Sequence, residues 1–156
     1  MTFALDLAAF AKKTDARTEA IVRRIVLDVA KSLIEMSPVG NKETWAANVE
    51  RASRGLPALP AGYVGGRFKG SWVFETGGIP TDDPNTIDAS GSSSLGRIEA
   101  GMGNRMSGNV HYIANNVPYA MALEEGHSRL QAPAGMVMFT TIKFSSIVAE
   151  AAAQLK

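Results

Sequence analysis

The feature that most limits the fold is a long amphipathic stretch near the start of the chain. Between Asp15 and Met36, apolar residues recur at steps of three and four, which is the period of a helix with one buried side. They are Val22, Ile25, Val26, Val29, Leu33 and Met36. Pro38 ends the helix, because Ser37 before it is pushed out of helical geometry. This helix needs a partner surface to cover its apolar side.

A second long helix is predicted at the end of the chain, from Ala134 to Leu155. Its expected buried face carries Met138, Ile142, Ser145, Val148, Ala152 and Leu155, with Phe139 and Ile147 beside it. Strands are expected at 68–76 and 109–117, where bulky residues come close to alternating. At the N-terminus, the alternation of Phe3, Leu5 and Leu7 favours a short strand over a separate helical turn.

Two stretches rich in glycine, proline and polar residues, 40–66 and 80–108, are expected to be long loops. Each has one short segment with helical character, at 43–54 and 92–102. We expect the second stretch to form an extended arm or hairpin, and both stretches to be poorly ordered in a free subunit. Further along, Pro118 starts a short helical turn that Gly126 ends.

These elements predict an α+β fold in which two long helices, about 15–36 and 134–155, pack on a small antiparallel sheet of up to four strands. The length of 156 residues suits a single domain, 1–156, with extended loops at 40–66 and 80–108.

Composition excludes several kinds of function. The formal net charge is +1, so no strong overall field attracts nucleic acid or an acidic membrane. The chain has no cysteine, which excludes thiolate nucleophiles and cysteine-bound zinc. Asp6 interrupts the apolar start, so we expect no signal peptide. No apolar run approaches the roughly 20 residues of a membrane span. We therefore expect a soluble protein, made without export and without a membrane partner.

The residues that could carry chemistry do not form a recognisable catalytic set. Glu124 and His127 have the helical spacing of a carboxylate–histidine metal pair, but zinc needs three or four ligands. The other histidine is His111. Ser92–Ser94 lie in a flexible stretch, and GMGNRMSG lacks the lysine of a phosphate-binding loop. We predict no enzyme activity, no metal site and no cofactor.

Basic and aromatic residues alternate in the middle of the chain. The basic residues are Arg51, Arg54, Arg67 and Lys69, and the aromatic ones are Trp45, Tyr63 and Trp72. Such a mixture occurs in nucleic-acid sites and in protein interfaces. The low net charge favours the protein interface, and a nucleic-acid-binding module remains the alternative.

Three segments resemble a known family. They are SPV at Ser37–Val39, GRFKGSW at Gly66–Trp72, and NNVPYAMALEEGHS followed by QAPAGMV, between Asn115 and Val137. Together they are similar to the neck and tail-completion proteins of long-tailed bacteriophages, the gene-ten-like family of the lambdoid group. In that family the first two segments form one continuous motif, whereas here residues 40–65 stand between them.

The resemblance implies a structural virion protein that is assembled in the host cytoplasm and located at the neck or tail end of the phage. Its expected form is a ring, a hexamer, that completes the tail and joins it to the head; a tail-terminator or head-closure ring is the alternative. Its expected partners are copies of itself, the connector or adaptor, the tail terminator and the tail tube. DNA would pass through the lumen without sequence-specific binding.

The resemblance also implies roles for individual residues. Arg67 is expected to pair with Glu124 or Glu125, Tyr119 and Leu123 to pack inward, and Glu124 to point outward. The segment Gln131–Pro133 would set the angle of the last helix. The complete set of expected interface residues is Arg51, Arg54, Tyr63, Arg67, Lys69, Trp72, Glu124 and Glu125.

Overall fold

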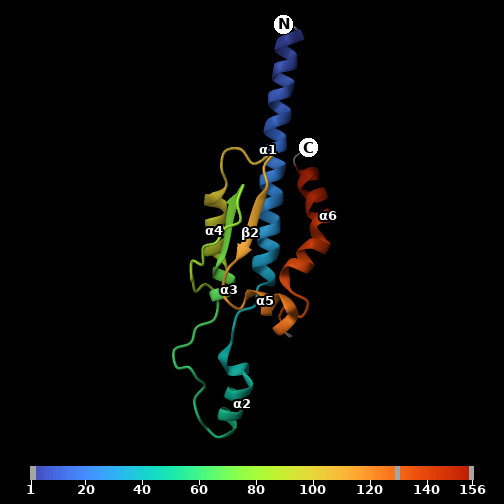
Figure 1. Ribbon diagram of the computed structural model, residues 1–156. Coiled ribbons are helices and arrows are strands. Elements are labelled where there is room, and N and C mark those ends of the chain that lie inside the picture. The colour runs from blue at the N-terminus through green and yellow to red at the C-terminus, as the bar shows by residue number, and fades with distance from the viewer. Residues whose placement is uncertain (1–2, 129–130, 155–156) are drawn as a thin grey trace.

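Helix α1 (Phe3–Met36) is the element on which the other parts of the molecule are arranged. The computed structural model describes residues 3–128 and 131–154. Helix α6 (Met136–Gln154) lies along one side of α1, and the sheet and helix α4 (Ser92–Gly101) lie on the other (Figure 1). Two residues of the predicted stripe, Val26 and Leu33, are buried in the core, together with Ala30 and Ile34, which were not expected there. The other four are only partly buried, namely Val22, Ile25, Val29 and Met36. The fold is α+β, as the sequence predicts.

The sheet has two antiparallel strands within the described residues, β1 (Trp72–Thr76) and β2 (His111–Asn115). It is therefore smaller than the sequence suggested. The start of the first expected strand is instead a short helix, α3 (Arg67–Gly70). Phe68 and Trp72 are four residues apart, which fits one helical turn as well as a strand period. The turn brings both rings into the core, with their centroids 5.6 Å apart.

Helix α4 corrects the prediction of an arm at 80–108. It packs against β1 and α1, and Ser94, Ile98 and Met102 on or just after it are buried. The short helix expected at 92–102 is confirmed, but it belongs to the core. Its glycines lower helix propensity, and burial of its apolar side overrides that weakness.

The loop that follows α4 is held by Glu19 of α1. The Glu19 carboxylate accepts hydrogen bonds from the backbone N–H of Met106 at 2.6 Å and from the backbone and hydroxyl of Ser107. The Ser107 hydroxyl, followed by the Met106 N–H, lowers the pKa of Glu19 below its usual value. These hydrogen bonds fix the polar loop after α4 to helix α1.

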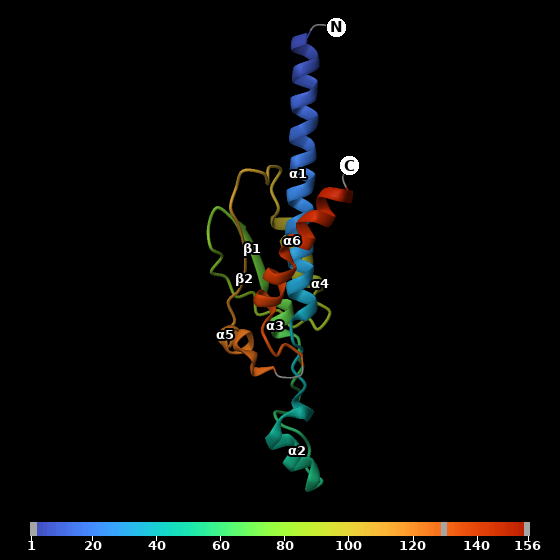
Figure 2. The same ribbon diagram turned by 90° about the vertical axis from the view of Figure 1, so that its right-hand side faces the viewer.

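Residues 40–66 form a lobe that extends from the end of α1 opposite the N-terminus (Figures 1 and 2). It contains the short helices η1 (Lys42–Thr44) and α2 (Ala46–Ser53), close to the expected segment 43–54. Buried Asn48 holds the lobe together through hydrogen bonds with the backbone of Lys42 and Leu59. The chain leaves the body and returns to it at one place. There Gly40 and Gly65 lie so close together that a Cβ on Gly65 would collide with the carbonyl oxygen of Gly40.

The first half of α1 projects beyond the rest of the molecule (Figures 1 and 2). The sequence favoured a strand over residues 3–7, and that prediction is wrong. The observed helix is explained by a second spacing in the same residues, because Leu7 and Phe10 are three apart and alanines fill the positions around them. Leu5, Leu7 and Phe10 remain exposed.

Helix α6 occupies nearly the predicted range, but a different face is buried. Met136, Thr140 and Ala151 are buried, whereas Met138 and Ile142, expected inside, are exposed. Leu155 lies outside the described residues. The helix is apolar on nearly every side, so its sequence pattern does not select the side that meets α1.

The same composition gives α6 one further property. The helix is long and apolar enough to cross a membrane, by length and composition only, which differs from the expectation that no segment qualifies. This is weak evidence for a span, because core helices of soluble proteins have the same composition.

Candidate interaction surfaces

The expected interface residues fall into three separate parts of the molecule. Arg51, Arg54 and Tyr63 belong to the lobe, Arg67, Lys69 and Trp72 to α3 and β1, and Glu124 and Glu125 to the turn η2 (Leu123–His127). Helices α2 and α3 lie apart in both views of the ribbon (Figures 1 and 2). Arg51 and Arg54 on α2 therefore lie away from Arg67 and Lys69 on α3, so the four basic residues do not form one patch.

Trp72 is a core residue. It is 3% exposed, and its indole N–H donates a 2.8 Å hydrogen bond to the Ser37 hydroxyl. Ser37 in turn donates to the carbonyl oxygen of Leu33 in the last turn of α1. The expectation that Trp72 contacts a partner is wrong, because burial leaves its ring no free surface. Its role is to fix the end of α1 to the sheet.

Arg67 pairs with Asp83, at 2.7 Å, and not with Glu124 or Glu125 as expected. The Asn85 N–H, and then Arg67, hold the pKa of Asp83 below its usual value. Tyr119 lies near this pair and near the ring of Phe68, and burial raises the pKa of its hydroxyl. Arg67 is partly exposed, so the ion pair forms part of the surface at the base of the lobe.

Glu124 caps helix α6 and does not point outward as expected. Its carboxylate accepts hydrogen bonds from the backbone N–H groups of Met136, Val137 and Met138, at 2.8, 3.1 and 3.1 Å. These groups have no partner inside the helix, and a negative charge is favourable there. Glu125 is exposed.

The turn η2 that carries Glu124 ends as the sequence predicts. Gly126 has φ +87°, a left-handed conformation that favours glycine. Leu123 packs against the core, as expected, whereas Tyr119 is 40% exposed and only partly covered. Helix α5 (Ala120–Ala122) precedes this turn.

The cap predicts a measurable difference between two adjacent glutamates. Glu124→Ala should lower the free energy of unfolding by about 1 kcal/mol, in the range of about 0.5–2 kcal/mol for helix caps. Glu125→Ala, the matched control, should change it by less than about 0.5 kcal/mol because the residue is exposed. Urea unfolding followed by circular dichroism measures both. Equal stability of the two variants would show that Glu124 does not hold α6.

The lobe carries the remaining expected interface residues. Arg54 forms an exposed ion pair with Glu50, and the Arg51 side chain donates to the carbonyl oxygen of Pro57 at 2.9 Å. Tyr63 packs edge-on against Trp45, with ring centroids 4.9 Å apart. Several apolar side chains of the lobe are also exposed, namely Val49, Leu56, Leu59 and Val64. The lobe thus presents a mixed apolar and basic surface.

The two histidines have ordinary surroundings. The ring nitrogens of His111 contact the Thr76 hydroxyl at 3.0 Å and the Met106 carbonyl oxygen at 2.8 Å, and the ring stacks on Phe74. His127 is exposed. Among the residues that the structure describes, no three His, Asp or Glu side chains come together as a metal site would require.

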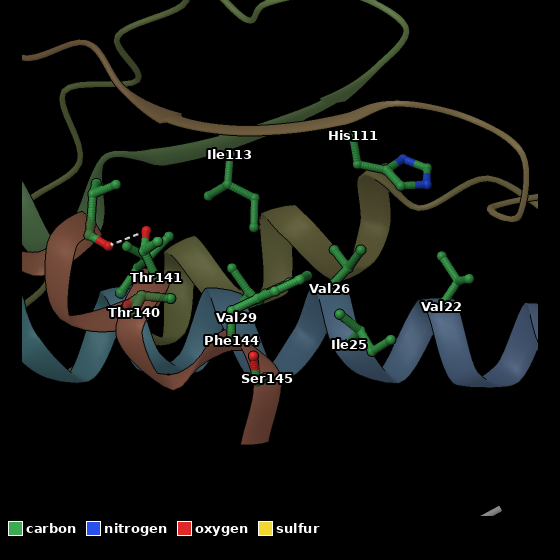
Figure 3. Close-up of a pocket in the computed structure, with 12 residues that line it drawn as sticks. Val22, Ile25, Val26, Val29, His111, Ile113, Thr140, Thr141, Phe144 and Ser145 are labelled. Atoms are coloured by element: carbon green, nitrogen blue, oxygen red, sulfur yellow. Dashed lines mark hydrogen bonds between the residues drawn. The ribbon is translucent and has the colours of Figure 1, made fainter. Parts of the chain in front are cut away.

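A groove between α1, α6 and β2 was not predicted from the sequence. It has a volume of about 510 Å³ and is shown in Figure 3. Val22, Ile25 and Val29 line it from α1, Ile113 from β2, and Val137 and Phe144 from α6. We call it the α1–α6 groove. The sequence did contain one indication of the groove. Helix α6 is apolar on nearly all sides, and α1 alone cannot cover so much apolar surface.

Comparisons with known proteins add no relative to these observations: no protein-family model, no curated protein and no solved structure matches the chain.

Proposed function

We propose that this chain is a structural subunit that works by assembling with other proteins and with copies of itself, and that it is not an enzyme. The support comes from what its polar residues do. Glu19, Glu124 and Ser37 each bind backbone groups or another buried side chain of the same fold. The α1–α6 groove and several exposed side chains of the lobe are apolar, which suits protein contacts better than chemistry on a small molecule.

More particularly, we propose a subunit of the neck or tail end of a long-tailed bacteriophage. One observation carries this proposal: the three segments of the family resemblance bind one another. Ser37 of the SPV segment accepts from Trp72 of GRFKGSW. Val39 and Gln131 exchange two hydrogen bonds, of 2.8 and 3.1 Å. The latter contact fits the expectation that Gln131–Pro133 orients the last helix.

The lobe explains why the first motif is split. Residues 40–65 leave and re-enter the body where Gly40 and Gly65 meet, so the two halves of the motif lie together as a continuous motif would place them. An insertion of this kind adds a projecting surface without changing the body. We propose that the lobe contacts a neighbouring protein of the neck.

In this role, copies of the chain form a ring, a hexamer in the proposal, between the finished tail and the head. The connector or adaptor, the tail terminator and the tail tube are its neighbours, and DNA passes through the lumen without sequence-specific contacts. A tail-terminator or head-closure ring would use the same surfaces, and the phenotype of particles without the protein distinguishes these roles.

Loss of the protein should leave filled heads and separate tails, or tails with defective ends. A phage with this gene disrupted tests the proposal by electron microscopy of lysates and by plaque counts. The wild-type gene supplied in trans should restore virions, and so should His127→Ala, because His127 has no role in assembly here. Normal virions without the protein would contradict the proposal, and failure of His127→Ala alone would indicate chemistry at that residue.

A further inference from the structure

The first half of α1 has an exposed apolar side. We call residues 3–18 the projecting half. Leu7 and Phe10 are three apart and share one side of the helix, whereas Leu5 lies on the opposite side. Their exposed fractions are 54% for Leu7, 68% for Phe10 and 65% for Leu5. A single exposed leucine such as Leu5 is ordinary, but Leu7 and Phe10 together form an apolar side that is suited to contact with a partner.

This side of the projecting half continues the wall of the α1–α6 groove. Eighteen residues make five helical turns, so Leu7 lies in line with Ile25, and Ala11 with Val29. Ile25 and Val29 line the groove. The projecting half cannot enter the groove of its own chain, because it is part of the same unbroken helix, which contains no glycine or proline between Phe3 and Met36.

We propose that the projecting half of one copy occupies the α1–α6 groove of a second copy, and that the exchange is reciprocal. Two α1 helices would then lie antiparallel, with the two bodies at opposite ends. This pair is the form we expect for the free chain before it meets other neck proteins. The inference rests on the proposed function only in requiring that copies of the chain associate.

The chemistry of the two surfaces agrees. Leu7 and Phe10 would enter a groove with walls of valine, isoleucine and phenylalanine and without a charged side chain among its lining residues (Figure 3). The one titratable lining residue, His111, already has a polar contact at each ring nitrogen. Insertion therefore leaves no charge of the groove unpaired. On the inserted side of the projecting half, Asp6 and Arg17 lie four and seven residues from Phe10, so their charged ends would stay at the solvent-exposed edge of the contact.

The area favours the reciprocal form. The groove is lined by α1 from Val22 to Leu33, about 17 Å along the helix axis, so half the side surface of a helix about 10 Å wide over that length is roughly 260 Å². With the matching surface of the groove, one contact buries about 520 Å², below the roughly 1,000 Å² of a specific interface. Two reciprocal contacts bury about 1,000 Å², which reaches that size.

Cysteine cross-linking tests the contact directly, because the native chain has no cysteine. In Leu7→Cys/Ile25→Cys the two thiols lie about 27 Å apart along one helix, too far for an internal disulfide. Any disulfide, or bridge by a short bis-maleimide, therefore joins two copies. The control is Leu5→Cys/Ile25→Cys, in which the first cysteine is equally exposed but on the opposite side. We expect a covalent dimer from the first variant and little from the second.

Solution mass provides the second measurement. By sedimentation equilibrium the wild-type chain should be a dimer, Leu7→Glu should weaken dimerisation by about tenfold or more, and Leu5→Glu should leave it unchanged. Both residues are exposed, so circular dichroism should show the same helix content in each variant. A monomeric wild type, or equal cross-linking of the Leu5 and Leu7 variants, would overturn the inference.

The two proposals fail separately. If the cross-link is specific to Leu7 but the gene disruption still gives normal virions, the helix exchange is supported and the neck function is contradicted. If the gene disruption leaves heads and tails unjoined but the purified chain is a monomer, the neck function is supported and the helix exchange is contradicted.

Discussion

Trp72→Ala should lower the free energy of unfolding by about 3–5 kcal/mol, the usual cost of removing a buried aromatic side chain. Trp72 is almost fully buried, packs against Phe68, and donates its indole N–H to Ser37. Alanine would leave a cavity between the end of α1 and the sheet, and would leave the Ser37 hydroxyl without its donor. Urea unfolding followed by far-UV circular dichroism measures the loss.

Two further substitutions separate packing from the hydrogen bond. Trp72→Phe keeps an aromatic ring but no donor, so it should cost less than alanine. Ser37→Ala keeps the ring and leaves the indole N–H buried without an acceptor, which costs about 1–3 kcal/mol. If Trp72→Ala were as stable as the wild type but failed in assembly, Trp72 would be the interface residue that the sequence suggested.

The elements that the sequence predicted correctly have a single hydrophobic period and a residue that clearly marks where the element ends. The second half of α1 has a single apolar stripe and ends before Pro38, and strand β2 has bulky residues at alternate positions before Pro118. Gly126 follows a short helical segment, and its positive φ confirms the predicted cap. In each case local chemistry excludes the competing conformations, so tertiary contacts do not need to decide.

The errors arise where local chemistry permits two answers. Residues 3–10 fit a strand period and a helical period equally, and the continuation into α1 decides for the helix. Helix α6 is apolar on most sides, so only the shape of its neighbours selects Met136, Thr140 and Ala151 as the buried set. The expectation for Trp72 failed for a similar reason, because tryptophan serves both as an interface anchor and as a buried core residue.

The motif residues illustrate this limit. The family resemblance selected Arg67, Trp72 and Glu124 as important, and the structure gives each an internal partner: Asp83, Ser37 and the first turn of α6. The sequence identified the residues but not their partners, because these lie far away along the chain. Conversely, Leu7 and the α1–α6 groove form no motif, and only the fold reveals them as exposed apolar surfaces.

Helix α4 allows the strongest test of the fold, because the sequence predicted an arm where the structure has a core layer. Ile98→Asp should prevent folding. Ile98 is 0% exposed, lies on a helix that packs against β1 and α1, and belongs to the cluster of buried apolar side chains. An unpaired buried charge costs several kcal/mol, in addition to the lost packing of isoleucine. That sum is comparable to the total stability of a domain of this size, which is about 5–15 kcal/mol.

Ala100→Asp is the matched control, since Ala100 lies on the same helix and is exposed. It introduces the same charge two residues away, and should change the free energy of unfolding by no more than about 1 kcal/mol, chiefly through helix propensity. Thermal unfolding and the yield of folded protein report both variants. If residues 80–108 were a mobile arm, aspartate would be tolerated equally at positions 98 and 100. If α4 is a core layer, the variant at position 100 folds and the variant at position 98 does not. A folded Ile98→Asp variant with unchanged thermal stability would therefore mean that α4 does not pack between the sheet and α1.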